Sequence, residues 1–156
     1  MKNEDHMRRA IALSLEMMRS GKGGPFGAVV VHDGKIIAEG FNQVTSHNEP
    51  TAHAEVVAIR LACQALGTFD LTGCEIFTSC EPCPMCLGAI YWARLDKIFF
   101  ANNRDDAAAI GFRDDFLYHE IPLPLDQRSI PTLSLLRAEG QLAFKEWDLK
   151  PDKVLY

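Results

Sequence analysis

Two short stretches of this sequence hold the residue types that zinc chemistry needs. The first reads Thr-Ala-His-Ala-Glu over residues 51–55, and the second reads Ser-Cys-Glu-Pro-Cys-Pro-Met-Cys over residues 79–86. Zinc prefers imidazole and thiolate ligands, and a catalytic zinc site uses three protein ligands and leaves its fourth position to water. His53, Cys83 and Cys86 supply such a set. The sequence therefore predicts a catalytic zinc site with one ion per chain held by these side chains.

Glu55 follows His53 by two residues and is the predicted proton carrier of this site. Zinc lowers the pKa of a coordinated water to about 7 in sites with neutral ligands. Here two thiolates already neutralise the dication, so a carboxylate base must help to remove the proton from the water. Glu55 meets that need, and it can later pass the proton to a ring nitrogen or to a departing amine.

The helix that carries His53 and Glu55 is predicted over residues 51–66, because Pro50 precedes it and Gly67 follows it. Both side chains then lie in the first turn. Residues two apart point to different sides of an ideal helix. Side chains of a first turn can nevertheless lean past the helix end, so we expect both to reach the metal site.

A second helix is predicted over residues 84–94, because Pro84 suits the first position of a helix. Cys83 then falls near the cap and Cys86 in the first turn, where free N–H groups and the positive end of the helix dipole favour thiolates. We expect this helix and the one that carries His53 to direct their N-termini at one metal between them.

The remaining hydrophobic pattern predicts an α/β fold. The chain opens with an amphipathic helix whose apolar residues recur at helical spacing, at Met7, Ile11, Leu15 and Met18. A hairpin turn is expected at Asp33-Gly34. Short strands are predicted over residues 26–31, 35–41, 74–79 and 96–101. Their alternation with helices indicates an α/β sandwich with some parallel pairing.

The pattern weakens after Asn102, where glycine and proline break the chain into short pieces. Only residues 132–137 and 141–147 look helical there, and residues 104–106 read as a solvated loop. No repeat or linker divides the chain, so a single domain over residues 1–156 is expected.

Composition narrows the function classes. The chain has 156 residues, 47% of them hydrophobic and 24% charged, as in a globular domain, and its apolar stretches are shorter than a membrane span. A net charge of −5 argues against a protein that wraps nucleic acid. The N-terminus lacks the pattern of a secretory signal, and five cysteines, an odd number, favour metal chemistry in a reducing compartment. A cytoplasmic protein is expected.

The pairing of His-x-Glu with Pro-Cys-x-x-Cys is typical of zinc nucleobase deaminases. His53-Ala-Glu55 and Pro82-Cys-Pro-Met-Cys86 match it without departure. From residues 24–28 through 50–55 to Gly111-Phe112 and Tyr156, the chain resembles the bacterial guanine deaminases of the cytidine deaminase-like superfamily over essentially its full length.

The resemblance implies a three-layer sandwich with a central five-stranded mixed sheet between helices. It implies a homodimer in which the C-terminal segment is exchanged between subunits, and it implies hydrolysis of guanine to xanthine and ammonia in purine catabolism or salvage. Phe26 and Trp92 would pack on the purine, Asn42 would hydrogen-bond its edge, and Tyr156 would close the pocket from the partner chain. Taken alone, Asn42 reads as a turn residue and Trp92 as a core aromatic.

The resemblance also implies that Asp114 assists proton transfer. Arg113 departs from the mostly acidic stretch typical of the family at this point, which leaves Asp115 as an alternative to Asp114.

Two other functions fit parts of the sequence. Adenosine deaminases acting on tRNA share the zinc residues, but the acidic charge and the lack of a basic C-terminal helix argue against an RNA substrate. A closed structural site of three cysteines and a histidine, with Cys80 as the added ligand, would indicate a module that binds a protein partner. A closed site would leave Glu55 without a role, and Cys80, like Cys63 and Cys74, reads as a core thiol.

Overall fold

The computed structural model describes residues 2–156. These form two compact units, one that ends at Asp115 and one from Phe116 to Tyr156. Within the first unit the elements follow the order α1 (Asn3–Arg19), β1 (Gly27–His32), β2 (Lys35–Phe41), α2 (Val44–His47), α3 (Ala54–Leu66), β3 (Cys74–Cys80), α4 (Pro84–Trp92), β4 (Lys97–Asn102) and α5 (Arg104–Ala109).

The sheet of the first unit has the strand order β2-β1-β3-β4. Strand β1 pairs antiparallel with β2 and β3, and β3 pairs parallel with β4. The predicted hairpin is confirmed, with φ angles of 49° at Asp33 and 71° at Gly34. The mixed pairing is confirmed as well.

The predicted fifth strand is wrong for the described chain, whose sheet has four strands. After β4 the chain turns into α5 because Asn103 caps that helix. The Asn103 side chain accepts a hydrogen bond from the amide of Asp106 at 2.9 Å, and the Asp106 carboxylate accepts one from the amide of Asn103 at 2.9 Å. Residues 104–106 therefore begin a helix, and their interpretation as a solvated loop is wrong. Strand β4 is left as an edge strand.

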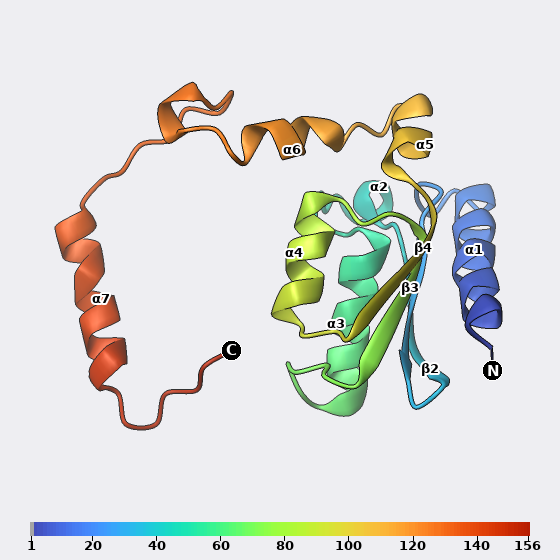
Figure 1. The fold of residues 1–156 in the computed structure, drawn as a ribbon, viewed down its shortest axis with the longest axis horizontal. Helices are drawn as coiled ribbons and strands as arrows, with labels where there is room; N and C mark the ends of the chain where they lie inside the picture. The colour runs from blue at the N-terminus through green and yellow to red at the C-terminus, as the bar shows by residue number, and fades with distance from the viewer. Residues whose placement is uncertain (1) are drawn as a thin grey trace. The chain divides into compact units, whose positions relative to one another are not determined.

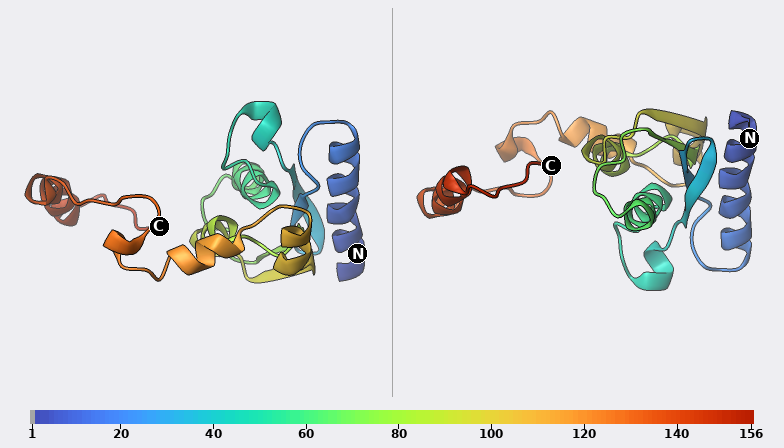
Figure 2. Two further views of the ribbon diagram at one scale, coloured as in Figure 1. Left: turned by 90° about the horizontal axis from the view of Figure 1, so that it is seen from above. Right: turned by 90° about the horizontal axis from the view of Figure 1, so that it is seen from below.

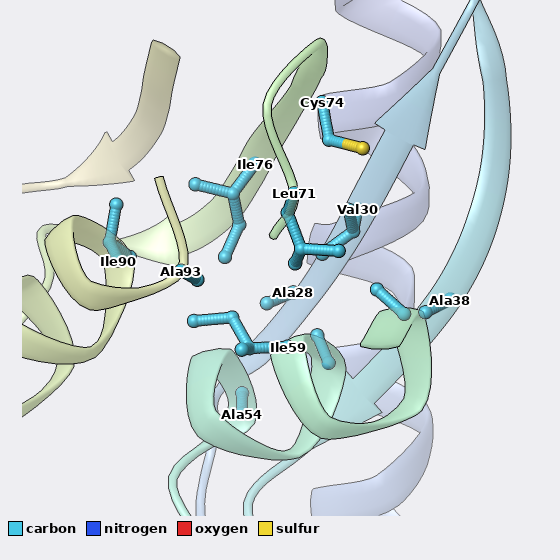
Figure 3. Packing of buried hydrophobic residues seen from close by; sticks show 12 residues of the cluster. Ala28, Val30, Ala38, Ala54, Ile59, Leu71, Cys74, Ile76, Ile90 and Ala93 are labelled. Atoms are coloured by element: carbon cyan, nitrogen blue, oxygen red, sulfur yellow. The ribbon is translucent and has the colours of Figure 1, made fainter. Parts of the chain in front are cut away.

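Helices cover both faces of the sheet, which confirms the sandwich (Figures 1 and 2). Helix α1 lies on one face, and α3 and α4 lie on the other. Successive residues of β1 alternate between the two layers: Val29 and Val31 pack with α1, and Ala28 and Val30 pack with α3. The larger of the two hydrophobic clusters lies under α3 and α4 and includes Ile59 and Ile76 (Figure 3).

Glycines allow two helices to approach the sheet closely. A Cβ atom at Gly40 of β2 would overlap the carbonyl oxygen of Ala54 and lie 2.6 Å from the amide nitrogen of Ala58. A Cβ atom at Gly27 of β1 would overlap Ala10 of α1 in the same way. The backbone of α3, and with it the residues at its N-terminus, is therefore set directly against β2.

The predicted boundaries hold closely for the strands and less well for the helices. Helix α3 begins at Ala54 rather than Thr51, because residues 51–53 form a turn in which the amide of His53 donates to the carbonyl of Thr51 at 2.8 Å. Helix α4 ends at Trp92, two residues earlier than expected, and Arg94 has a φ of 59° that a helix does not permit.

The second unit contains η1 (Leu125–Gln127), α7 (Arg137–Leu149) and, across its boundary with the first unit, α6 (Asp115–Glu120). The helix predicted over residues 132–137 is wrong. Residues 131–135 have no helical structure, and Leu136 has a left-handed φ of 55° directly before α7 begins. No residue between Phe116 and Tyr156 is buried. This unit therefore has no hydrophobic core of its own.

Candidate metal centre

The predicted ligands lie at the N-termini of α3 and α4, beyond the carboxyl end of β3. His53 is the N-cap residue of α3, with an extended backbone (φ −67°, ψ 154°). Cys83 is the N-cap residue of α4, and Pro84 occupies the first position of that helix. Because His53 precedes the helix rather than lying in its first turn, the helical geometry that would separate it from Glu55 does not apply.

The three donor atoms have spacings suited to zinc. His53 Nδ1 lies 3.5 Å from Cys83 Sγ and 3.4 Å from Cys86 Sγ, and all three atoms lie within 4.8 Å of one another. A tetrahedral zinc with bonds of about 2.3 Å to sulfur and 2.0–2.1 Å to nitrogen separates an S and an N ligand by about 3.6 Å. The donor set and its spacing therefore fit zinc.

Hydrogen bonding and charge prepare the cysteine pair for a cation. Cys83 Sγ accepts a hydrogen bond from the amide of Cys86 at 3.5 Å. Its contact with the Cys86 side chain, together with His53, lowers the pKa of Cys83 to about 4. The same contact and burial raise the pKa of Cys86. The contact with Cys83 raises the pKa of His53. A dication bound at the three donor atoms would displace the protons that the thiols and the imidazole hold without it.

Glu55 lies in the first turn of α3 and is 6% exposed. Burial raises the pKa of its carboxyl, as expected for a group that both takes up and releases a proton near neutral pH. Its Oε2 atom lies 3.4 Å from Cys86 Sγ. Its Oε1 atom accepts a hydrogen bond from Thr78 Oγ1 at 3.3 Å. The predicted proton carrier is thus adjacent to the predicted ligands.

Cys80 lies outside the three-donor cluster found among the described residues. Its Sγ atom donates to the carbonyl of Asn103 at 3.9 Å, and burial raises its pKa to about 11. The thiol is therefore engaged with the backbone of Asn103 and not with the three donor atoms. These contacts agree with a packing role for Cys80.

Asp114 is half-buried, and its Oδ1 atom is fully buried without a hydrogen-bond partner. Burial raises the pKa of its carboxyl, and the charge of Cys83 raises it further. The carboxylate therefore interacts electrostatically with the metal centre. Asp115 Oδ1 is likewise buried and unpaired, so both carboxylates stay candidates for the second proton carrier.

Two of the four predicted purine contacts lie together near the loop that follows β2. Asn42 is 7% exposed, and its backbone N–H donates to the backbone carbonyl of Phe26 at 3.2 Å. Asn42 Oδ1 accepts from the amide of Val44 at 3.2 Å, which leaves the NH₂ group of its side chain to face other partners. The ring of Phe26 meets that of Phe112 edge to face, with centroids 4.8 Å apart.

The other two predicted contacts belong to α4 and to the second unit. Trp92 is the last residue of α4, about 12 Å along the helix axis from the end that carries the cysteines, and it is 68% exposed. Its contact with the purine stays a prediction. Tyr156 belongs to the second unit, and its contact was expected from a partner chain, so it stays a prediction.

The sequence interpretation missed Thr78 as a contact of Glu55 and Phe112 as a contact of Phe26. Thr78 contacts Glu55 although the two residues are 23 positions apart in the sequence, and no local sequence pattern predicts such a contact. For Phe112 a hint was available, because Gly111-Phe112 was among the residues that carried the resemblance.

A family model described as the cytidine and deoxycytidylate deaminase zinc-binding region matches residues 1–102. The chain belongs to this family of zinc deaminases. The matched residues include the three-donor cluster and Glu55. Membership confirms the cytidine deaminase-like α/β fold, and it identifies zinc as the metal of a hydrolytic deaminase.

Within the deaminase family, the chain is 53% identical over 147 residues to the guanine deaminase of Bacillus subtilis, with 94% of each chain covered. A crystal structure of Bacillus subtilis guanine deaminase matches it with a TM-score of 0.97 at 51% identity, covering 100% of this chain and 99% of the other. The tRNA-specific adenosine deaminase of Agrobacterium fabrum is 41% identical over 86 residues, which cover 55% of this chain and 57% of the relative.

No helix in the part of the chain that the structure describes is long and apolar enough to cross a lipid bilayer.

Proposed function

We propose that this deaminase hydrolyses guanine to xanthine and ammonia. The observation that carries the proposal is the juxtaposition of a His53, Cys83 and Cys86 cluster with the buried carboxylate of Glu55, in a chain 53% identical to a guanine deaminase over 94% of its length. The net reaction forms a bond between the oxygen of a water molecule and the ring carbon that bears the amine. It breaks the bond between that carbon and the amine nitrogen. The enzyme would serve purine catabolism or salvage in the cytoplasm.

The residues of the metal centre have different roles in this reaction. When held by His53, Cys83 and Cys86, zinc supplies Lewis acidity that makes a water molecule easier to ionise. Glu55 accepts the proton of the attacking water and returns it to a ring nitrogen or to the departing amine. Its burial supports this role, because a raised pKa lets the carboxyl hold a proton between the two transfers.

A purine is recognised, in this proposal, by an aromatic wall and a polar edge. Phe26 packs on the ring and is itself held by the edge-to-face contact with Phe112. Asn42 donates from its amide group to the edge of the purine, since its Oδ1 is already engaged by Val44. Asp114, with its unpaired oxygen, assists the proton transfers to the leaving group.

We further propose a homodimer in which the second unit is exchanged between copies. Residues 116–156 bury none of their apolar side chains, and Phe100 of the edge strand β4 is 48% exposed. Both surfaces need a partner. Residues 130–135, which carry three exposed apolar side chains, would add a fifth strand to the sheet of a second copy, and Tyr156 of the same chain would close the pocket of that copy.

A screen of ammonia release across guanine, adenine, cytosine, cytidine and tRNA tests the substrate. Guanine is expected to be turned over far faster than the others. Preferred turnover of adenosine in tRNA would overturn the proposal in favour of the editing function of the relatives that share about half the chain. A zinc-loaded protein inactive on every compound would favour a structural zinc module.

A further inference from the structure

Thr78 is a buried hydroxyl that the reaction as described above does not use. It lies on β3 and is 1% exposed. Its neighbours across the sheet are Ala28 of β1 and Phe100 of β4. Within β3 it follows Ile76 on the same face, which is the face covered by α3 and α4. Its side chain therefore points from the sheet toward the helix that carries Glu55.

The hydroxyl of Thr78 has two acceptors within reach. Oγ1 donates to Glu55 Oε1 at 3.3 Å and to the carbonyl oxygen of Cys80 at 3.0 Å. A hydroxyl has one proton and two lone pairs, so it donates to only one of these at a time. The other carboxylate oxygen of Glu55, Oε2, lies 3.4 Å from Cys86 Sγ. The two oxygens are thus distinguished: Oε2 faces the metal ligands and Oε1 faces Thr78.

We infer that Thr78 is a positioning residue for Glu55, an inference that rests on the proposed role of Glu55 as proton carrier. The carboxylate must keep one oxygen aimed at the reacting water, and rotation about its last bond would exchange the two oxygens. A hydrogen bond from Thr78 to Oε1 opposes that rotation.

The same hydroxyl serves both forms of Glu55. While Glu55 is a carboxylate, Thr78 donates to Oε1. Once Oε2 carries the proton taken from water, Oε1 is the carbonyl oxygen of the acid and still accepts from the Thr78 hydroxyl. Thr78 is therefore a suitable partner for Oε1 in both states.

Ser79 provides a matched control on the same strand. It is 2% exposed, and its Oγ accepts a hydrogen bond from the amide of Gly27 at 3.0 Å, so it also ties strands together through a buried hydroxyl. It makes no hydrogen bond to Glu55. Loss of a buried hydroxyl can therefore be separated from loss of the contact with the carboxylate.

The test is steady-state kinetics of guanine hydrolysis by zinc-loaded Thr78→Val, Thr78→Ser, Thr78→Ala and Ser79→Ala enzymes. Thr78→Val is expected to lower kcat roughly 10- to 100-fold, the range expected when a reacting group is misaligned, with KM changed less than about threefold. Thr78→Ser should restore kcat to within about threefold of the wild type. Ser79→Ala should lower the unfolding temperature but keep kcat.

A Thr78→Val enzyme with wild-type kcat, or a Thr78→Ser enzyme as slow as Thr78→Val, would overturn the inference. If the valine variant does not fold, the serine and alanine variants decide, because they differ by the hydroxyl alone: equal kcat values for the two would overturn it. Failure of the proposed function looks different. In that case the wild type itself does not hydrolyse guanine, or Glu55→Gln retains its turnover.

Discussion

Glu55 is a buried carboxylate whose surroundings suit proton transfer. It is 6% exposed, and burial raises the pKa of its carboxyl although the charge of His53 acts in the opposite direction. It contacts Cys86 and Thr78, residues on α4 and β3. Burying a carboxyl is costly, and that cost favours the protonated form. A group poised in this way is suited to proton transfer rather than to stability.

Glu55→Gln is expected to keep zinc and lose catalysis. The amide preserves the shape of the side chain but cannot accept a proton. Positioned acid and base groups contribute about 10²- to 10⁴-fold. Because Glu55 serves more than one transfer, kcat for guanine should fall by about 10⁴-fold or more, while metal analysis still finds one zinc per chain. A variant that retains a tenth of wild-type turnover would mean that the water ionises without help from Glu55.

The ligand residues were predictable from the sequence because zinc ties residue type to spacing. His53, Cys83 and Cys86 could be chosen from local patterns alone, and the structure brings their donor atoms together. Thr78 could not be chosen in this way, because its hydroxyl acts on a carboxylate 23 residues distant and its own sequence neighbourhood is that of any buried strand.

At the scale of elements, the site depends on how closely α3 packs on the sheet. Gly40 of β2 faces the first turns of α3, and the backbone of Ala54 and Ala58 fills the space where a side chain would be. His53 precedes Ala54 directly, and Glu55 follows it. Any displacement of α3 from β2 therefore moves a metal ligand and the proton carrier together.

Gly40→Ala is expected to destabilise the protein by about 1–3 kcal/mol, the usual cost of overpacking, and to lower zinc affinity as α3 shifts. Urea unfolding and zinc analysis of the same preparation measure the two effects. Gly88→Ala on α4 is the control, since a Cβ atom there meets no atom of the chain within 4 Å and alanine favours a helix. Equal stability and equal zinc content in the Gly40 variant and the wild type would contradict the close-packing account.

Element boundaries were predicted best where glycine or proline enforces them. Gly67 ends α3 in the left-handed conformation with a φ of 65°, and Pro84 begins α4. The start of α3 was misplaced because Pro50 precedes a turn rather than the helix. Helix α5 was missed although Asn103 and Asp106 form a capping box, since its single buried residue, Ala107, gives no helical pattern of apolar residues.

At the scale of the whole molecule, the two units differ in what holds them together. The first has hydrophobic clusters on both faces of its sheet. The second exposes most of its apolar side chains, and Leu133, for example, is 89% exposed. Sequence patterns predicted the four strands of the sheet, and only the family resemblance implied a fifth. They did not indicate the contrast between the units, because it depends on which surfaces meet and not on local preference. The proposed exchange of the second unit between copies would cover these apolar side chains.

Deletion of residues 154–156 is expected to leave folding and zinc content intact and to lower kcat/KM for guanine by roughly tenfold or more, because an uncovered site admits water. Discrimination against bulkier purines should relax as well. Tyr156→Phe is the control that keeps the aromatic ring, and it should stay close to wild type. Unchanged kinetics and selectivity after the deletion would contradict the proposal that Tyr156 covers the site.

Complementation tests the exchange itself. A chain that lacks residues 154–156 has an intact metal centre but no Tyr156 to cover it. A full-length Cys83→Ala chain has Tyr156 but no intact metal centre. When the two are refolded together, the exchanged dimer predicts more guanine turnover than the sum of the separate proteins. No gain above that sum, with mixed dimers present by mass, would mean that each tail serves its own chain.

Zinc-dependent turnover of guanine tests the central claim most directly. Protein freed of metal with a chelator is titrated with zinc while xanthine formation is followed. The account predicts no turnover without zinc, a linear rise to one equivalent per chain, the same titration for Cys80→Ser, and neither tight zinc binding nor turnover for Cys83→Ala. Xanthine formation that is independent of bound zinc, or a fully metallated and active Cys83→Ala protein, would contradict it.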